Sequence, residues 1–422
     1  MKLTVIGTGY VGLVTGACFA KLGHTVTCVD VDTTKVELIN NGQTPIYEPG
    51  LEDLLQTYAH NLHATTDATT AIYQSDITFI CVGTPSHKDG SIDLTYIQNS
   101  AAQIGKILRN LPGWHLIVIK STVVPGTTDT TVRHLLETNS NKHANTDFGL
   151  AMNPEFLREG NAIHDFLTPD RIVIGVSDQK TADTLRHLYT GFTCPIIETS
   201  LSAAEMIKYA SNAFLATKVS YINEIGNLCK TLNIDTYQVA EGMGYDHRIG
   251  RAFLDAGIGW GGSCFPKDID ALLAWVKDHH TTAPIITATR TVNQNQPLRL
   301  IPLLQKHVPK LKGKTIGLLG LAFKPQTDDI RESRAIPIAT ELLKHGAFIK
   351  AYDPQAMNNF KTLFPTIEYC THPQEVLNSD AVLITTKWEE FSSLDFTGKI
   401  VIDGRRLDEA KKTARIYEGV CW

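Results

Sequence analysis

The chain has 422 residues, of which 43% are hydrophobic and 20% charged, and its formal net charge at pH 7 is −5. This balance is typical of a globular protein with two or three domains of about 150 residues each. The sequence contains no arginine-rich arm or basic stripe, so we expect no nucleic-acid partner. No apolar run reaches the about 18 residues that a membrane span needs, so we expect no membrane partner either.

The eight cysteines are scattered and include no C-x-x-C pair, which is typical of a reducing compartment. Residues 1–20 combine a lysine with an apolar run, so a signal peptide is an alternative interpretation of this stretch. Gly7, Gly9 and Gly12 interrupt the run, and we therefore favour a cytoplasmic protein.

The first elements along the chain predict a dinucleotide site. A short β-branched run, residues 2–6, leads into Gly7, Gly9 and Gly12 in the pattern G-x-G-x-x-G, and apolar residues then continue at helical spacing. In such a turn the first glycine makes the bend, the second lets a pyrophosphate approach the backbone, and the third packs helix against strand. A flavin site or a purely structural turn is the alternative.

The next predicted strand ends in Asp30, about 20 residues after the glycine pattern. A carboxylate there would hydrogen-bond the ribose hydroxyls of NAD and repel the additional phosphate of NADP. Lys35 either flanks the adenosine or is a solvated surface lysine.

Strands and helices continue to alternate, which predicts parallel βαβ units. Residues 171–176 are expected to form the last strand of the first half. The C-terminal third repeats the pattern without the glycine fingerprint, and between the halves residues 202–234 predict one long helix with an apolar stripe. We therefore expect an α/β chain of two doubly wound, Rossmann-like domains joined by a long central helix. We expect the same helix to form the interface of a homodimer. The predicted parts are an NAD-binding domain (1–200), a central helical region (201–295) and a C-terminal domain (296–422).

The stretch "GIGWGGSCFPKD" places Gly257, Gly259, Gly261 and Gly262 just before Cys264 and a predicted helix. The helix dipole and the nearby lysine of "FPKD" favour a thiolate, and the glycines would leave room for a substrate beside it. This predicts a nucleophile; a glycine-rich turn with an incidental cysteine is the alternative.

Lys208 and Asn212 are four residues apart on the long helix and therefore share one face. A lysine and an amide on a mostly apolar helix could together stabilise a developing oxyanion. The alternative is an ion pair of Lys208 with Glu205 and an exposed asparagine. No metal site is expected, because His279 and His280 point apart on a helix and no carboxylates join them.

The motifs "GTGYVG", "GTPS", "KST", "NPEFLREG", "AEMIKYASNAFLATKVSYINE", "GWGGSCFPKD" and "LAFKPQTDDIRES" together resemble the UDP-glucose 6-dehydrogenase family, from Met1 to about Arg406. The resemblance implies oxidation of the 6-hydroxyl of UDP-glucose to a carboxylate with two NAD per turnover. It implies that Cys264 holds the aldehyde as a thiohemiacetal and then as a thioester that water cleaves. GDP-mannose and UDP-N-acetylmannosamine are alternative substrates, although Trp260 and "SCFPKD" fit the glucose branch better.

The same resemblance implies roles for further residues. Lys208 and Asn212 would polarise the reacting oxygen, Asp268 would organise water or a proton relay with Thr122, and either Glu155 or Asp268 would take the proton during hydrolysis. Besides the glycine turn, the implied NAD contacts are Val11, Asp30, Lys35, Thr84, Thr122, Glu159, Lys267 and Arg331. The implied substrate contacts are Phe156, Leu157, Arg158, Glu159, Lys208, Asn212, Arg251, Phe253, Leu254, Asp255, Ala256, Gly257, Gly261, Phe323, Lys324 and Arg405, and Arg251 would reach the substrate of a neighbouring subunit.

Overall fold

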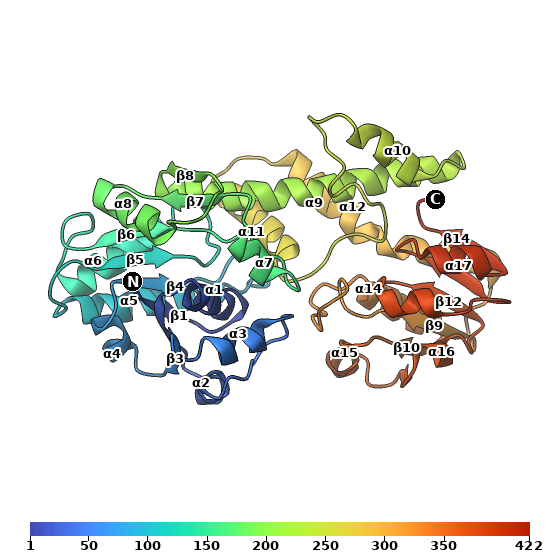
Figure 1. Cartoon of the computed structure of the whole chain (residues 1–422). Helices are drawn as coiled ribbons and strands as arrows, with labels where there is room; N and C mark the ends of the chain where they lie inside the picture. The colour runs from blue at the N-terminus through green and yellow to red at the C-terminus, as the bar shows by residue number, and fades with distance from the viewer. The chain divides into compact units, whose positions relative to one another are not determined.

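The computed structural model describes all of residues 1–422, which divide into two compact units, residues 1–211 and 212–422. Each unit is built on a mostly parallel sheet flanked by helices (Figure 1). None of the helices combines the length and the apolar character that crossing a bilayer demands.

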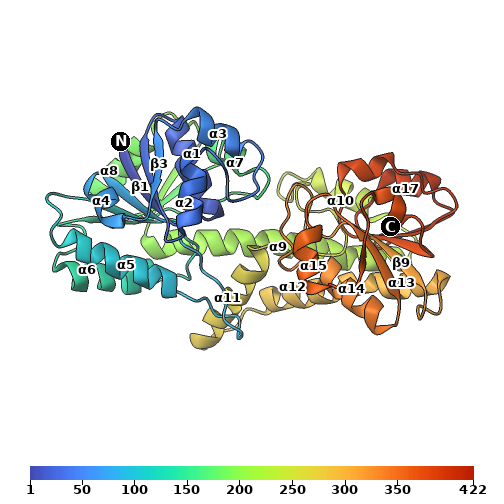
Figure 2. The same ribbon diagram turned by 90° about the horizontal axis from the view of Figure 1, so that it is seen from below.

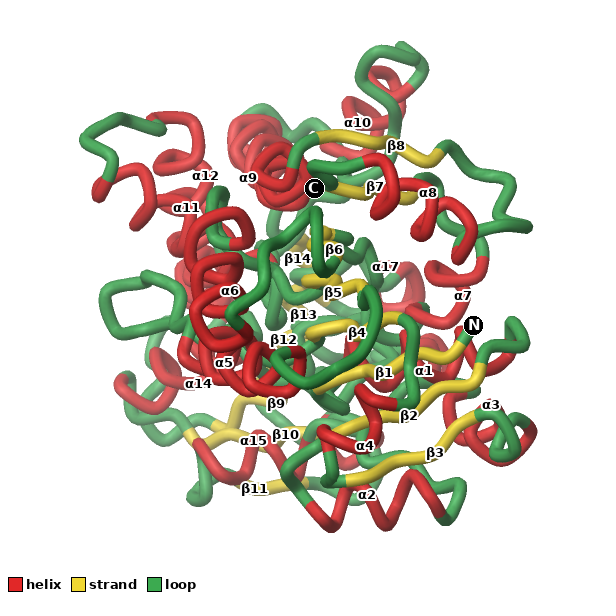
Figure 3. Tube along the Cα trace, turned by 90° about the vertical axis from the view of Figure 1, so that its left-hand side faces the viewer, coloured by secondary structure: helices red, strands yellow, loops and turns green.

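The first unit contains an eight-stranded sheet in the order β3-β2-β1-β4-β5-β6-β7-β8, whose strands fan out in Figure 3. Its first six strands follow the order of a dinucleotide-binding fold, which reverses direction between β1 and β4. β7 meets β6 antiparallel at Met152 and Gly175, and β8 runs parallel to β7. The expectation that residues 171–176 form the last strand of this half was wrong, because β8 follows at the sheet edge. The strands are β1 (Lys2–Ile6), β2 (Thr25–Val29), β3 (Leu62–Thr65), β4 (Ile77–Ile80), β5 (Leu116–Ile119), β6 (Gly149–Met152), β7 (Ile172–Gly175) and β8 (Ile196–Thr199).

Helices cover both faces of this sheet, so its central strands are apolar on both sides (Figure 2). In β5, Leu116 and Val118 enter the core beneath α1, whereas Ile117 and Ile119 enter the core beneath α5. The helices are α1 (Tyr10–Lys21), α2 (Thr33–Asn40), α3 (Leu51–Thr57), α4 (Ala68–Tyr73), α5 (Thr95–Leu108), α6 (Arg133–Ser140), α7 (Ala162–Leu167) and α8 (Gln179–Leu188), and a π-helical turn, Thr128–Val132, leads into α6.

The long predicted helix is present as α9, Leu201–Thr231, a single helix of 31 residues. Its first turns belong to the first unit, where Leu201 and Ala204 are buried in the core beneath α5. The absence of proline and the apolar stripe explain why one helix runs through this stretch.

The second unit opens with helices and ends in a six-stranded parallel sheet, order β11-β10-β9-β12-β13-β14. This repeats the strand order of a dinucleotide-binding fold around one apolar core. Two doubly wound α/β units and a long central helix are therefore confirmed. The elements are α10 (Thr236–Gly244), α11 (Phe265–Asp278), α12 (Pro284–Asn295), a 3₁₀ turn (Pro297–Arg299), α13 (Leu300–His307), β9 (Thr315–Leu319), α14 (Ala335–Lys344), β10 (Phe348–Tyr352), α15 (Met357–Leu363), β11 (Glu368–Tyr369), α16 (Pro373–Val376), β12 (Ala381–Ile384), a 3₁₀ turn (Glu389–Ser393), β13 (Ile400–Asp403), α17 (Asp408–Thr413) and β14 (Ile416–Gly419).

Candidate active and cofactor-binding sites

The three glycines between β1 and α1 differ in what surrounds them. Gly7 has a φ of +94°, and a side chain there would also meet the carbonyl oxygen of Cys81 at 2.9 Å. A methyl group on Gly12 would overlap the carbonyl oxygen of Gly7, whereas nothing lies within 4 Å of the corresponding position on Gly9. Gly7 and Gly12 are therefore required by the turn itself, and Gly9 alone leaves open space next to the backbone.

Asp30 follows β2 and faces this turn. Its Oδ2 accepts hydrogen bonds from the Thr8 N–H at 2.8 Å and the Thr8 hydroxyl at 2.6 Å, and its Oδ1 accepts one from the Asp32 N–H at 3.1 Å. Partial burial favours the neutral acid, but these hydrogen bonds and the charge of Lys35 hold the pKa of Asp30 below its usual range. An ionised carboxylate beside an open glycine turn fits the ribose and pyrophosphate of NAD.

Further predicted cofactor residues lie at the same edge of the sheet. Thr84 follows β4 and Thr122 follows β5, and the Thr84 hydroxyl donates to the Thr122 carbonyl oxygen at 3.0 Å. Because β1, β4 and β5 are neighbours and parallel, the segments after them meet where the strand order reverses. Val11 belongs to the first turn of α1, beside the glycines.

The second unit also has an aspartate directly after its second strand, but this carboxylate cannot bind a ribose as Asp30 can. Asp353 follows β10 but is fully buried, and its carboxylate is occupied by hydrogen bonds from inside the unit. The donors are the N–H groups of residues 321, 322, 355 and 356 and the Trp388 indole. This carboxylate has no capacity left for a ribose, so the acceptor that NAD needs exists only in the first unit.

The segment after β6, residues 153–160, contains Glu155, a predicted proton acceptor, and several predicted substrate contacts. Glu155 is buried and forms an ion pair with Lys208, with Oε1 2.9 Å from Nζ, and its Oε2 accepts the Leu157 N–H at 2.6 Å. Burial alone would raise the pKa of Glu155, but Lys208 and Lys120 lower it. Lys208 thus pairs with Glu155, and the alternative of an ion pair with Glu205 was wrong.

Glu205 instead binds the backbone of the loop after Thr122. Its carboxylate accepts the N–H groups of Gly126 at 2.5 Å and Thr128 at 2.8 Å, and burial raises its pKa to about 7. This contact ties the start of α9, which carries Lys208, to a predicted cofactor segment.

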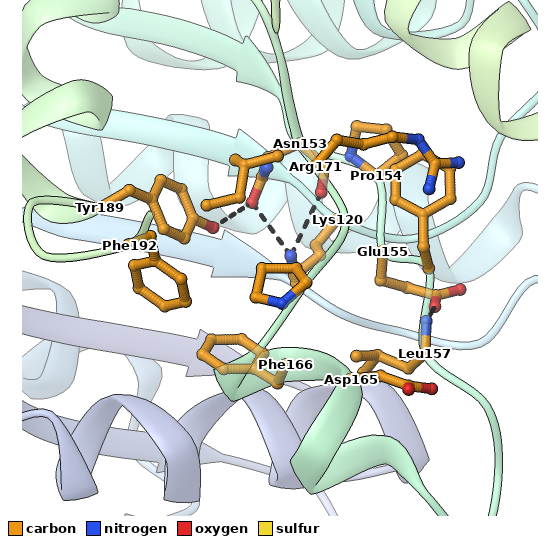
Figure 4. A pocket seen from close by; sticks show the side chains of 13 residues that line it. Lys120, Asn153, Pro154, Glu155, Leu157, Asp165, Phe166, Arg171, Tyr189 and Phe192 are labelled. Carbon is orange, nitrogen blue, oxygen red and sulfur yellow. Dashed lines mark hydrogen bonds between the residues drawn. The ribbon is translucent and has the colours of Figure 1, made fainter. Parts of the chain in front are cut away.

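Figure 4 shows the pocket beside residues 153–157, which is lined mainly by apolar and aromatic side chains. Phe156 lies in its wall with the Arg171 guanidinium 3.7 Å from its ring centre, and Leu157 lines it as well. Arg158 is not among the lining residues, but it forms an ion pair at 2.6 Å with Asp165, which is one of them. Glu159 follows in the same loop.

Glu48, which the sequence analysis missed, joins this loop to the glycine turn. Its buried carboxylate accepts the N–H groups of Gly160 at 2.6 Å and Ala162 at 2.7 Å, and it is also hydrogen-bonded to the Tyr10 hydroxyl. Tyr10 is the first residue of α1 and also accepts the Gly160 N–H at 2.9 Å. No local pattern marks Glu48, since its three partners are distant in sequence.

In the second unit, Cys264 occupies the N-cap position of α11 and is partly buried, with the Ser263 hydroxyl 3.5 Å from its sulfur. Pro266 is in the first turn of this helix, where its missing N–H costs no intrahelical hydrogen bond. The N-terminus of the helix carries partial positive charge, which favours a thiolate at this position.

Asp268, one turn into α11, is 2% exposed and binds two other predicted residues. It accepts the Asn212 side-chain amide at 2.6 Å and the Lys267 ammonium at 2.7 Å. Asn212 is therefore a buried hydrogen-bonding partner of Asp268 and not the exposed asparagine of the alternative reading.

The glycines before Cys264 have a packing role within the unit. A side chain on Gly261 would overlap the carbonyl oxygen of Glu332, and one on Gly262, where φ is +86°, would lie 2.6 Å from the Phe323 ring. Gly257 donates its N–H to the Asn223 side chain at 2.7 Å. Gly261 and Gly262 therefore let the segment from Phe323 to Glu332 approach their own backbone closely.

The remaining predicted residues of this unit differ in burial. Leu254 and Ala256 belong to the core, whereas Arg405 is partly buried and donates to the carbonyl oxygens of Thr385 at 2.9 Å and Gly259 at 3.2 Å. Phe253 has a φ of +65°, an uncommon conformation for a large side chain.

Three basic residues complete the predicted set in this unit; Arg331 is exposed, whereas Arg251 and Lys324 are partly buried. Arg251 forms ion pairs with Asp255 at 2.5 Å and Glu241 at 3.3 Å, and Arg331 pairs with Asp329 at 2.7 Å. The Lys324 ammonium lies 5.6 Å from the ring centre of Phe323.

Comparisons with known proteins agree with this arrangement. Three models of the UDP-glucose/GDP-mannose dehydrogenase family match: the NAD binding domain over residues 1–193, the central domain over 202–295 and the UDP binding domain over 317–409. A UDP-glucose 6-dehydrogenase of Haloferax volcanii is 46% identical, with 96% of this chain and 97% of that protein covered. A second, from Bacillus subtilis, is 43% identical, with 99% and 93% covered. The structure of a UDP-glucose dehydrogenase from Pyrobaculum islandicum covers 100% of this chain and 97% of its own, with 43% identity and a TM-score of 0.96.

Proposed function

This chain belongs to the UDP-glucose/GDP-mannose dehydrogenase family, and on that premise we propose that it is an NAD-dependent UDP-glucose 6-dehydrogenase that makes UDP-glucuronate. The observation that carries the substrate assignment is similarity over nearly the whole chain to proteins of that name, at 46% and 43% identity. The open position at Gly9 beside the ionised Asp30 supports NAD as the cofactor. In this proposal residues 1–200 bind NAD, residues 201–295 contribute the catalytic cysteine, and residues 296–422 bind the uridine nucleotide.

Bound NAD supplies a hydride acceptor for each of the two oxidation steps. The protein must hold the intermediate aldehyde between them, and Cys264 is suited to this because the α11 N-terminus favours its thiolate. The sulfur adds to C6 of the aldehyde, and a proton on the oxygen completes a thiohemiacetal. Loss of the hydride from C6 and of the proton from the hydroxyl then gives a thioester. Water attacks the thioester carbonyl, the C6–S bond breaks, and a carboxylate and the thiolate result as two protons are released.

The other catalytic residues act on oxygen and on protons in this proposal. Lys208 carries a positive charge held in place by Glu155, and it polarises the reacting oxygen together with Asn212. Asp268 fixes the Asn212 amide through the hydrogen bond at 2.6 Å. Glu155 or Asp268 accepts the proton of the hydrolytic water, with Thr122 as a further member of the relay.

The stoichiometry of NADH tests the proposal directly. We expect about two NADH per UDP-glucose, because a covalent intermediate prevents release of the aldehyde. GDP-mannose and UDP-N-acetylmannosamine serve as competitors, and a clear preference for either would transfer the assignment to that sugar. Cys264→Ser should reduce UDP-glucuronate formation about 10³-fold or more. One NADH per sugar, or full turnover without the thiol, would contradict the mechanism.

We propose further that two copies associate through α9. Phe214, Tyr221 and Leu228 are 64%, 50% and 58% exposed and recur every seven residues, so they form one apolar stripe on the helix. Replacing Phe214 and Leu228 by glutamate should convert a dimer to a monomer in light scattering, whereas a wild-type monomer would refute the assembly. None of the eight cysteines forms a disulfide, which supports a cytoplasmic location.

A further inference from the structure

Lys120 is a buried lysine to which the proposed reaction assigns no role. It follows β5 and is 4% exposed, and its ammonium donates only to oxygens of Asn153, to Oδ1 at 3.0 Å and to the carbonyl oxygen at 3.4 Å. No carboxylate lies within ion-pair distance of it. Burial lowers the pKa of Lys120 to about 8, so the side chain is still mostly protonated near neutrality.

A buried cation of this kind lowers the stability of the fold. The pKa of Lys120 is lower in the folded than in the unfolded chain, so its stability contribution is present above the unfolded pKa and is lost as pH falls towards 8. At pH 7 an apolar side chain of similar length would make a more stable protein. A purely structural role therefore does not explain why a lysine occupies this position.

The residue that Lys120 contacts, Asn153, is held from three sides, and Figure 4 draws its hydrogen bonds with Lys120 and Tyr189. The Asn153 Oδ1 accepts from Lys120 and also from the Tyr189 hydroxyl at 2.5 Å, and its Nδ2 donates to the Val173 carbonyl oxygen at 2.8 Å. Asn153 is thereby fixed against β5, β7 and the end of α8. Glu155 is only two residues after Asn153, so the position of Asn153 limits where Glu155 can lie when it pairs with Lys208.

Charged and polar groups from several elements surround Glu155. Lys208 on α9 is in direct contact, Lys120 after β5 acts through space, and the Leu157 N–H supports the other oxygen. Cys81, at the end of β4, faces Lys120, but burial raises the pKa of its thiol to about 12, so it remains neutral. Lys120 is therefore the second cation that favours the ionised form of Glu155.

We propose that Lys120 is a positioning residue for the proposed oxidation: its charged ammonium anchors Asn153, and Asn153 in turn sets Glu155 beside Lys208. This inference rests on the proposed function, because it concerns the Glu155–Lys208 pair to which that function assigns catalytic roles. It accounts for a protonated amine in a buried site, which neither the fold nor the Glu155–Lys208 pair requires.

The test compares Lys120→Met, Lys120→Arg and Tyr189→Phe in the full-length enzyme. The first removes the charge, the second keeps a charge that does not titrate, and the third removes the other hydrogen bond to the Asn153 oxygen without changing any charge. The measurement is kcat for NADH formation at saturating UDP-glucose and NAD from pH 6.5 to pH 9.5, together with KM for UDP-glucose.

We expect the wild-type kcat to fall as pH rises past about 8, because Lys120 loses its proton there. Lys120→Met should lower kcat at pH 7.5 about 10-fold or more, since small misplacements of catalytic groups are costly, and it should abolish that alkaline limb. Its KM for UDP-glucose should change less than about threefold. Lys120→Arg should move the limb to higher pH, and Tyr189→Phe should leave its position unchanged.

A Lys120→Met enzyme with the wild-type kcat and alkaline limb would overturn the inference, as would equal losses in Lys120→Met and Lys120→Arg, which would indicate packing and not charge. If Lys120→Met yields too little folded protein, Lys120→Gln makes the same comparison. A wild-type enzyme that is inactive with UDP-glucose would refute the proposed function instead, so the two failures are distinguishable.

Discussion

Replacing Gly9 by alanine separates cofactor binding from folding in the glycine turn. Gly9 has φ −71° and ψ −170°, which alanine adopts without strain, and no atom lies within 4 Å of the position of the added methyl group. The unfolding free energy should therefore be unchanged or should rise by about 0.4–1 kcal/mol, because alanine restricts the unfolded chain. The methyl group occupies the space that the pyrophosphate needs. We expect the dissociation constant for NAD to rise about 100-fold, or about 2.8 kcal/mol.

Gly12→Ala is the matched control, with the same chemical change three residues later. Its methyl group would overlap the Gly7 carbonyl oxygen and lie 3.0 Å from Cys81 Cβ, and a backbone oxygen cannot rotate away. We expect a loss of about 1–3 kcal/mol or more in stability, with weakened NAD binding as a consequence. Urea unfolding and calorimetric NAD titration of both variants measure the two effects. Normal NAD affinity in Gly9→Ala, or equal destabilisation of both variants, would refute this reasoning.

Three other substitutions test contacts that the fold makes. Glu48→Gln leaves one backbone N–H of the loop facing an amide NH₂ group, so the free energy of unfolding in urea should fall by about 1–3 kcal/mol. Proteolysis near residue 160 should become faster, and an unchanged rate would argue that Glu48 does not anchor this loop. Asp353→Asn should lower stability by a similar amount, about 1–3 kcal/mol, while calorimetry still finds one NAD per chain; loss of NAD binding would contradict the assignment of that carboxylate to folding. The pKa of Glu205 is raised in the folded chain to about 7, so its contribution is present below the unfolded pKa and is lost as pH rises to about 7. Glu205→Gln should make the fall in stability between pH 5 and pH 7 shallower, as measured by urea midpoints, and an equal slope would count against this origin.

Most of the architecture could be predicted from short stretches of sequence. The glycine turn, the strand ending in Asp30 and the helix without proline between residues 202 and 234 each depend on neighbours within a few turns of chain. The last strand of the first half was misjudged because β8 carries exposed residues and lies at the sheet edge, where the apolar signal is weak.

Turn chemistry, helical period and motif order are local properties, so the fold class, the family and the residue types of the site could all be predicted from the amino-acid order. Which charged groups meet depends on the three-dimensional fold: Lys208 pairs with Glu155 and not with Glu205, which is nearer in sequence, and Glu48 binds a loop more than a hundred residues away. The fold also leaves Asp30 available to a ribose while it encloses Asp353. These contacts arise because strand order in a parallel sheet brings the segments after β1, β4, β5 and β6 to one edge, and no short stretch of sequence encodes that order.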